Sequence, residues 1–420
     1  MSGYNRLEQI IGRYLDRFPR VKAGVEYGYQ RVNYHLFSER GFEYELHEDV
    51  MLHAAEDVYA DPRPAAARFV GFYDVCPWSP SMDSLFLHEV SSDPSDPSAN
   101  LIVLDDDGIE PVATTRAWNY QQGSRTQWHP TRDGVLLFND READTLVGRV
   151  VETSGTVLDT YPRPLQAVDP TGAEYLSVNY RRLDRNSPGY GYGTDDGSSL
   201  ESPDEDGIHR VGFDGSEELI VSFEDLITAA GVDVPHDRHY IHHALYSPNG
   251  QQFVFLHRWM DGETRYTRLY VADRAGETRL LSDNRHVSHF CWLDNERLFM
   301  WGGTAESGSG YYILNIPSGT TEYIEALDGY GDGHPSLSPD GQWIVTDTYP
   351  DRFRQRHLML YHIETERVIS VGRFNAPFGY DGVTRCDLHP RWSPDGRLVS
   401  IDSTHAGDRR SYVLDVSELI

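Results

Sequence analysis

The chain has 420 residues, 39% hydrophobic and 12% aromatic, which is ample apolar material for a packed core and excludes a disordered chain. It carries 66 acidic and 37 basic residues, and the formal net charge of −29 repels phosphate backbones and argues against nucleic-acid binding. Lys22 is the single lysine. Acidic excess with almost no lysine is typical of halophilic proteins, in which salt shortens the reach of charge repulsion. The alternative is a solvated acidic surface without a specific role.

The N-terminal segment is predicted to be helical. Residues 4–17 place five apolar side chains at helical spacing, namely Leu7, Ile10, Ile11, Tyr14 and Leu15, and a weaker pattern continues to about Tyr34. The segment has no apolar signal core, and no stretch of the chain approaches the ~18 apolar residues of a membrane span. The three cysteines lack CxxC spacing, which argues against a disulfide framework. We expect a soluble, cytoplasmic protein without a membrane span.

Short strand patterns follow in close succession. They alternate or run fully apolar and are separated by Gly, Pro, Asp and Asn, as in "SLFLHEV", "GVLLFND", "QQFVFLHRW", "RLFMWGG", "WIVTDTYP" and "LVSIDST". One helical pattern interrupts them, "SFEDLITAAG" at 222–231. The body of the chain is therefore predicted to be all-β.

A repeated turn divides this body into seven units. Each unit has an aromatic or apolar residue before a polar turn, as in "RWSPDG", and the aligned positions are Trp78, Trp128, Val168, Tyr246, Trp292, Leu337 and Trp392. The steps are 40 to 55 residues, apart from one of 78 that contains a Gly, Ser and Asp-rich insertion at 181–207. This period is typical of four-stranded propeller blades. We predict a seven-bladed β-propeller at 69–420.

The remaining residues, 1–68, are assigned to an N-terminal helical segment and a ring-closing strand. Residues 37–50, "FSERGFEYELHEDV", are expected to supply that strand and to pair with the C-terminal "RSYVLDV".

Four consecutive units carry a histidine in one register. Three residues before each aligned position stand Val75, Arg125, Leu165, His243, His289, His334 and His389, near the start of the innermost strand. The histidines are thus expected to meet at the central channel. One reading is that they only pack there. Neutral imidazoles also bind Zn or Mn, and Cys291, Asp332 and Asp387 lie close enough in sequence to join them or to orient their rings.

The blade phrases "HPSLSPDGQWIVTDTYPD", "CDLHPRWSPDGRLVSIDSTHAGDRRSYVLDV" and "YRRLDRNSPGYGYG" resemble those of propeller-type polysaccharide lyases, the oligogalacturonate lyase and ulvan lyase families. The resemblance covers roughly residues 70–420. It implies a divalent metal (Mn, Zn or Ca) held in the channel by His289, His334 and His389, and an acidic oligosaccharide as substrate.

Such a lyase removes the C5 proton of a uronic acid by metal-assisted β-elimination, which requires that the neighbouring carboxylate be neutralised. We assign this to the metal and Arg125, and the proton transfers to His243 and Tyr190. The predicted substrate-binding residues are Trp118, Tyr120, Tyr180 and Arg182. The chain is thus interpreted as a carbon–oxygen lyase.

The alternative is a propeller without catalytic activity that binds glycans or serves as a scaffold, for example in surface-polysaccharide metabolism. It stays open because a fold alone does not determine function. A serine-peptidase propeller is disfavoured, since no hydrolase domain with a GxSxG motif follows.

Overall fold

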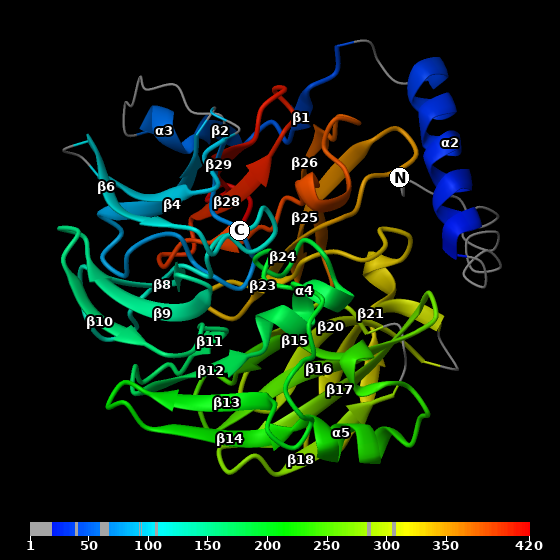
Figure 1. Cartoon of the computed structure of the whole chain (residues 1–420). Helices are drawn as coiled ribbons and strands as arrows, with labels where there is room; N and C mark the ends of the chain where they lie inside the picture. Colours follow the sequence, from blue (N-terminus) through cyan, green and yellow to red (C-terminus); the bar gives the residue numbers. More distant parts are fainter. Residues whose placement is uncertain are drawn as a thin grey trace.

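The computed structural model describes residues 19–420 apart from 38–40, 59–66, 92, 94, 106–107, 284–286 and 305–307. Its described strands form seven antiparallel sheets arranged around one axis (Figure 1). The predicted seven-bladed β-propeller is therefore confirmed. The helix expected over residues 4–17 lies outside the described residues.

Each blade begins at its innermost strand. The first blade consists of β3 (Ala67–Phe69), β4 (Ser84–Val90), β5 (Ala99–Asp105) and β6 (Gly108–Thr115), and the second of β7 (Gln127–Trp128), β8 (Val135–Glu142), β9 (Thr145–Glu152) and β10 (Val157–Tyr161). The third blade consists of β11 (Ala167–Val168), β12 (Glu174–Val178), β13 (Gly207–Gly212) and β14 (Glu217–Ser222). The fourth consists of β15 (His239–Tyr246), β16 (Gln252–Asp261), β17 (Thr264–Asp273) and β18 (Thr278–Ser282). The fifth is β19 (Phe290–Trp292), β20 (Arg297–Thr304), β21 (Gly308–Asn315) and β22 (Thr321–Tyr323). The sixth is β23 (Ser336–Leu337), β24 (Trp343–Asp347), β25 (Gln355–His362) and β26 (Val368–Asn375), and the seventh is β27 (Arg391–Trp392), β28 (Leu398–Ser403) and β29 (Arg410–Asp415).

The repeated Ser-Pro-Asp-Gly turns have one hydrogen-bond pattern. Ser338 Oγ donates to Asp340 and accepts from the Trp343 N–H, and Ser393 does the same with Asp395 and Leu398. The turn glycines take the left-handed conformation that favours this residue, with φ of 74° and 73° at Gly341 and Gly396. The turn chemistry thus joins the innermost strand to the next one in the same way in both blades.

Two N-terminal strands complete the last two blades. β1 (Tyr44–Leu46) pairs with β26, and β2 (Met51–Ala54) pairs with β29. The expectation for 37–50 was therefore wrong in its partner: the strand inside that range joins the sixth blade, and the strand that closes the ring lies just beyond it. The seventh blade has three strands of its own among the described residues, β27 to β29. β2 pairs with its outer strand β29 and supplies the fourth strand of the blade.

The helices at residues 19–37, 55–58 and 223–230 lie at the edges of the propeller (Figure 1). α2 (Pro19–Phe37) flanks the sixth blade, where the Gln30 side chain donates to the Pro350 and Asp351 carbonyls and the Tyr34 ring meets Phe378. The expected helix near 222–231 is present as α5 (Phe223–Ala230), and α3 (Ala55–Val58) is short. Three 3-10 turns span His236–Arg238, Glu325–Leu327 and Gly382–Thr384. None of the described helices is long and apolar enough to span a membrane.

The insertion of the third blade contains a helix that its Gly, Ser and Asp-rich composition did not predict, α4 (Tyr180–Asn186). The Asn179 side chain caps this helix by accepting the N–H groups of Arg181 and Arg182.

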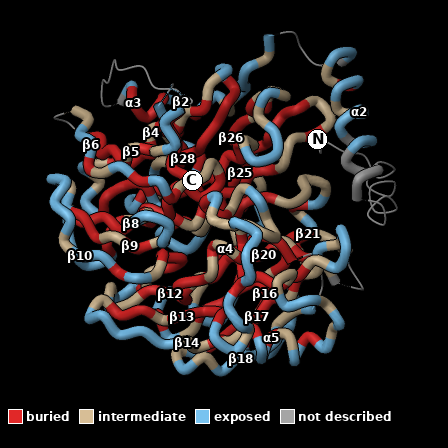
Figure 2. Tube along the Cα trace, in the orientation of Figure 1, coloured by how far each residue is buried: buried red, intermediate tan, exposed pale blue. Residues whose placement is uncertain are grey.

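The apolar core lies between neighbouring blades, and the buried stretches follow the strands (Figure 2). Between the sixth and seventh blades, for example, Val345, Leu360, Trp392 and Leu414 pack together. This packing fixes the relative positions of the inner strands, and the four aligned histidines lie within these strands or one to two residues before them.

Candidate active site

The four aligned histidines lie side by side at one end of the channel. The ring centroids of His243 and His289 are 5.4 Å apart, those of His289 and His334 are 4.2 Å apart, and those of His334 and His389 are 4.3 Å apart. The expected convergence is therefore confirmed. His243 and His389 share a left-handed backbone with φ of 55° and 46°, an uncommon conformation that is concentrated at functional sites.

A fifth histidine extends the row. The ring of His242 is 4.1 Å from that of His243, and both nitrogens of each ring are buried without a hydrogen-bond partner among the described residues. Burial lowers the pKa of both rings well below the usual value, so both are neutral at pH 7. His242 was not among the predicted site residues, because the repeat alignment places only one histidine of each blade at the channel, although the His242–His243 doublet is plain in the sequence.

Phe72 and Tyr73 fill the channel next to the row. The Tyr73 ring lies 5.4 to 6.1 Å from the rings of His243, His289, His334 and His389, and its hydroxyl donates to the Phe290 carbonyl. The Phe72 ring is 4.8 Å from His243. These aromatic side chains come from the segment that leaves β3 and crosses the channel.

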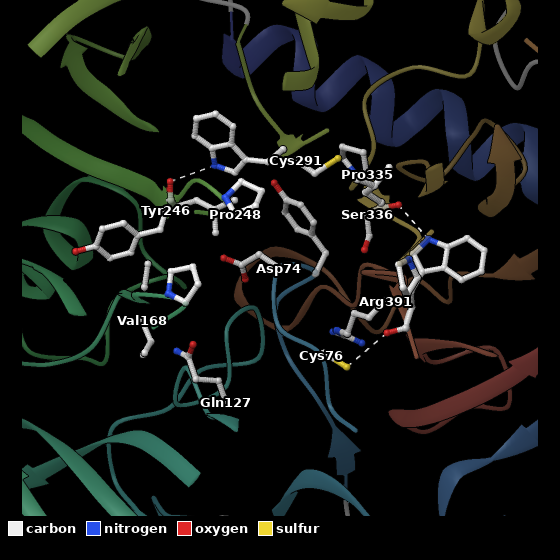
Figure 3. Close-up of a pocket in the computed structure, with 18 of the residues that line it drawn as sticks. Asp74, Cys76, Gln127, Val168, Tyr246, Pro248, Cys291, Pro335, Ser336 and Arg391 are labelled. Atoms are coloured by element: carbon white, nitrogen blue, oxygen red, sulfur yellow. Dashed lines mark hydrogen bonds between the residues drawn. The ribbon is translucent and has the colours of Figure 1, made fainter. Parts of the chain in front are cut away.

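A cavity of about 480 Å³ lies among the inner strands of the propeller (Figure 3). Its walls come from the inner strands and turns of several blades and include Asp74, Cys76, Cys291 and Arg391. Tyr73 contributes to this wall, whereas none of the five histidines does among the described residues. Tyr73 therefore separates the cavity from the histidine row.

A buried group of His334, Asp387 and His389 has the composition of a metal site. Their ligand atoms all lie within 4.8 Å of one another. His389 Nδ1 donates to the Gly71 carbonyl at 2.6 Å and His334 Nδ1 bonds to Asp347 Oδ1 at 2.8 Å. The Nε2 atoms of both histidines are buried and have no protein partner among the described residues. Tying Nδ1 down and leaving Nε2 as an acceptor is how metal-binding histidines are oriented.

The third member, Asp387, is held as a carboxylate. Arg385 Nε donates to Oδ2 at 2.7 Å, and Arg356 Nη1 lies 2.8 Å from Oδ1 without hydrogen-bond alignment. Burial alone would raise the pKa of this carboxyl, but Arg385 and Arg356 hold it well below its usual range. The residues present therefore fit a divalent cation: two imidazole nitrogens and one carboxylate oxygen suit Mn²⁺ or Zn²⁺, whereas Ca²⁺ favours oxygen ligands alone.

His289, the other predicted ligand, stands next to this group. Its Nδ1 bonds to Asp332 Oδ1 at 2.9 Å, and it is not one of the three residues whose ligand atoms cluster. Of the predicted set, the structure thus groups His334 and His389 with Asp387.

Arg125 is part of the channel wall. Its guanidinium donates to both oxygens of Asp74, at 2.8 and 3.0 Å, and to the Gln166 carbonyl. The charge that was expected to bind a substrate carboxylate is therefore already compensated by Asp74.

Tyr190 does reach the site, because the insertion of the third blade folds over it. Its ring meets His242 edge-on at 4.7 Å, and its hydroxyl accepts a hydrogen bond from Arg385 Nη2 at 3.3 Å. The Gln122 side chain donates to the Tyr190 carbonyl and fixes the loop.

The other predicted sugar-binding residues have different positions. Tyr180 and Arg182 are each 1% exposed: Tyr180 donates to the Leu165 carbonyl, and Arg182 pairs with Asp206 at 2.7 Å. Both are interior residues of the insertion, and their polar groups are already bonded to other described residues. Trp118 and Tyr120 pack against Phe69 of the first blade, and none of the described ring contacts joins them to the histidine row.

Solved structures with this fold include oligogalacturonate lyases. One, in complex with manganese, aligns with a TM-score of 0.59 at 13% identity and covers 83% of this chain and 90% of its own. Another, from Vibrio parahaemolyticus, has the same TM-score at 12% identity and covers 88% and 97%. The chain shares their fold. A prolyl endopeptidase aligns more loosely, with a TM-score of 0.49 at 11% identity over 96% of this chain and 57% of its own. No protein-family model matches the chain, and no curated relative matches it either.

Proposed function

We propose that this protein is a metal-dependent lyase that cleaves uronic-acid-containing oligosaccharides by β-elimination. The observation that carries the proposal is the buried trio of His334, Asp387 and His389, whose two Nε2 atoms are oriented and unpartnered among the described residues. The fold shared with oligogalacturonate lyases supports the same substrate class. We propose Mn²⁺ or Zn²⁺ as the bound ion because of the mixed nitrogen and oxygen ligand set.

A bound divalent cation would neutralise the uronate carboxylate and so acidify the neighbouring C5–H bond. The chain itself must then accept the C5 proton. His243 is suited to this task because burial, followed by the effects of His242 and His289, keeps its pKa well below the usual value. The ring is therefore neutral, and one of its two nitrogens, neither of which has a hydrogen-bond partner among the described residues, can accept the proton. A neutral imidazole within reach of the substrate is a general base.

Tyr190 is placed to protonate the leaving oxygen. Its hydroxyl oxygen accepts a hydrogen bond from Arg385, so its own proton remains available for the substrate. The adjacent guanidinium also stabilises negative charge that develops on the phenol oxygen once the proton is given up.

The test is to incubate the protein with uronate oligosaccharides and follow the ultraviolet absorbance of the unsaturated product. We expect activity that is lost on chelation and restored by Mn²⁺ or Zn²⁺. His334→Ala and His389→Ala should each lower turnover by about 10²- to 10³-fold, while His53→Ala, an exposed histidine on β2, should leave it unchanged. Sugar binding without product, unaffected by chelation, would instead indicate a glycan-binding propeller.

A further inference from the structure

Arg258 differs from the other buried arginines of this chain. Five of them each lie 2.7 to 2.9 Å from a carboxylate: Arg68 with Glu89, Arg125 with Asp74, Arg182 with Asp206, Arg356 with Asp387, and Arg391 with Asp402. Two others, Arg354 and Arg409, donate instead to backbone carbonyls, and Arg354 also donates to the Gln30 side chain. Arg258 is only 4% exposed, and neither an ion pair nor a hydrogen bond joins it to any described residue. An uncompensated buried guanidinium is costly, so it calls for an anion.

The position of Arg258 connects it to the histidine row. On β16 it stands opposite Tyr240 of β15, and His242 follows Tyr240 by two residues, so the Arg258 and His242 side chains share one face of the sheet. His242 is 3% exposed, and both of its nitrogens lack a partner among the described residues. Arg258 Nε and the two His242 ring nitrogens, all three unpartnered, thus belong to side chains on the same face of neighbouring strands, and Arg258 is close enough for its charge to lower the pKa of His242.

The surroundings of this pair favour a negative ligand. Burial and then the nearby Arg265 lower the pKa of Arg258 to about 10, and the other groups that act on it are tyrosines, with no carboxylate among them. Although the chain has 66 acidic residues, none of those that the structure describes forms an ion pair with this guanidinium. A planar guanidinium binds a carboxylate or a sulfate with two parallel hydrogen bonds, and a neutral imidazole adds one more donor.

We propose that Arg258 and His242 form a second anion-binding subsite, which recognises a carboxylate or sulfate group on the sugar next to the uronate held at the metal centre. This inference rests on the proposed lyase function. His242 and His243 link the subsite to that centre, with ring centroids 4.1 Å apart and with His289 and His334 continuing the row. The preferred substrate therefore carries a negative group on each of two neighbouring sugars.

Binding is measured by calorimetry with three 4-linked disaccharides: uronate with uronate, uronate with a sulfated sugar, and uronate with a neutral sugar. We expect one of the two dianionic ligands to bind about 10- to 100-fold more tightly than the neutral-sugar ligand, as hydrogen bonds to a charged group allow. Whichever dianionic disaccharide binds more tightly shows whether the subsite recognises a carboxylate or a sulfate. Arg258→Met should abolish the difference and leave binding of the neutral-sugar ligand unchanged. If wild type and Arg258→Met prefer the dianionic ligand over the neutral-sugar ligand to the same degree, the proposed subsite is wrong.

Stability without ligand gives an independent readout. Arg258 has no carboxylate partner, so Arg258→Met should keep or raise the unfolding temperature. Arg391→Met removes the ion-pair partner of the buried Asp402 carboxylate and should lower the unfolding temperature. Equal destabilisation by both substitutions would show that Arg258 has a structural partner and would contradict the inference. If wild type cleaves no uronate and binds no metal, the lyase proposal fails, while the calorimetric comparison still decides whether the subsite exists.

Discussion

Asp347 orients His334: its Oδ1 lies 2.8 Å from His334 Nδ1 and also accepts the His334 backbone N–H, while Oδ2 accepts the backbone N–H of His389. One carboxylate of the sixth blade thus positions two candidate metal ligands from neighbouring blades. Although burial alone would lower the pKa of the His334 ring, Asp347 raises it above the usual value. The same hydrogen bond keeps the proton on Nδ1 and leaves Nε2 as an acceptor.

Asp347→Asn is expected to weaken metal binding by about 10- to 100-fold, since the amide can donate to Nδ1 and thereby move the ring proton to Nε2. Metal affinity is measured by calorimetric titration with Mn²⁺ and Zn²⁺, and circular dichroism checks the fold. Asp340→Asn, in the turn that follows β23, is the matched control. An unchanged affinity in Asp347→Asn would show that His334 is not a ligand.

Arg125 is expected to matter for stability more than for turnover. Its position in the histidine register suggested a substrate clamp, but its guanidinium is bound to Asp74. Arg125→Gln leaves the Asp74 charge unpaired in a largely buried position, and losing one partner of such a pair costs about 3–5 kcal/mol of folding free energy. The double variant Arg125→Gln/Asp74→Asn should recover part of this loss in denaturant titrations. A full loss of turnover with unchanged stability would restore the clamp assignment.

The sequence could predict the blades because their signals are local. The turn at Ser338 and the turn at Ser393 use side chains two to five residues apart, so the motif and its structure coincide. The histidine row was predictable from the repeat, because residues at the same position of successive blades lie next to one another around the propeller axis. Tyr180 and Arg182 were predicted to bind sugar, whereas the structure buries both in α4, a helix that begins at the Asn179 cap and was not predicted.

The rest of the site depends on contacts between distant segments. Tyr73 leaves the first blade and reaches Phe290 in the fifth, 217 positions away. Asp347 bonds across to His389 in the next blade, and no spacing in the sequence encodes either contact. Arg258 was indistinguishable from the other arginines, since its lack of a carboxylate partner is visible only once the fold is known.

Acid is expected to destabilise the protein from pH 6.5 downward. His88 is fully buried between the Val70 carbonyl and the hydroxyls of Ser124 and Thr126, and burial lowers its pKa to about 4. Between pH 6.5 and 4, His88 binds a proton in the unfolded chain but not in the folded chain. The free energy of unfolding therefore falls as the pH falls. One pKa unit corresponds to about 1.4 kcal/mol, which makes the full effect of His88 roughly 3 kcal/mol.

Denaturant titrations at several pH values test this expectation. His88→Gln should lower the free energy of unfolding at pH 7, yet make its decline toward pH 4 shallower by an amount that corresponds to at most one bound proton. Parallel slopes in His88→Gln and wild type would mean that the folded protein also protonates His88 in this range.

Salt is expected to improve substrate capture. The net charge of −29 repels an acidic oligosaccharide at long range, while the groups proposed to bind it act only at contact distance. Screening shortens the reach of the repulsion from ~10 Å at 0.1 M to ~3 Å at 1 M ionic strength. KM for a uronate disaccharide should therefore fall as NaCl is raised, with little change in kcat, over the range in which circular dichroism shows a constant fold. Choline chloride at equal ionic strength should act like NaCl, since screening does not depend on the identity of the cation. A KM that rises with salt would show that attraction by Arg258, Arg385 and the bound ion outweighs the repulsion of the surface.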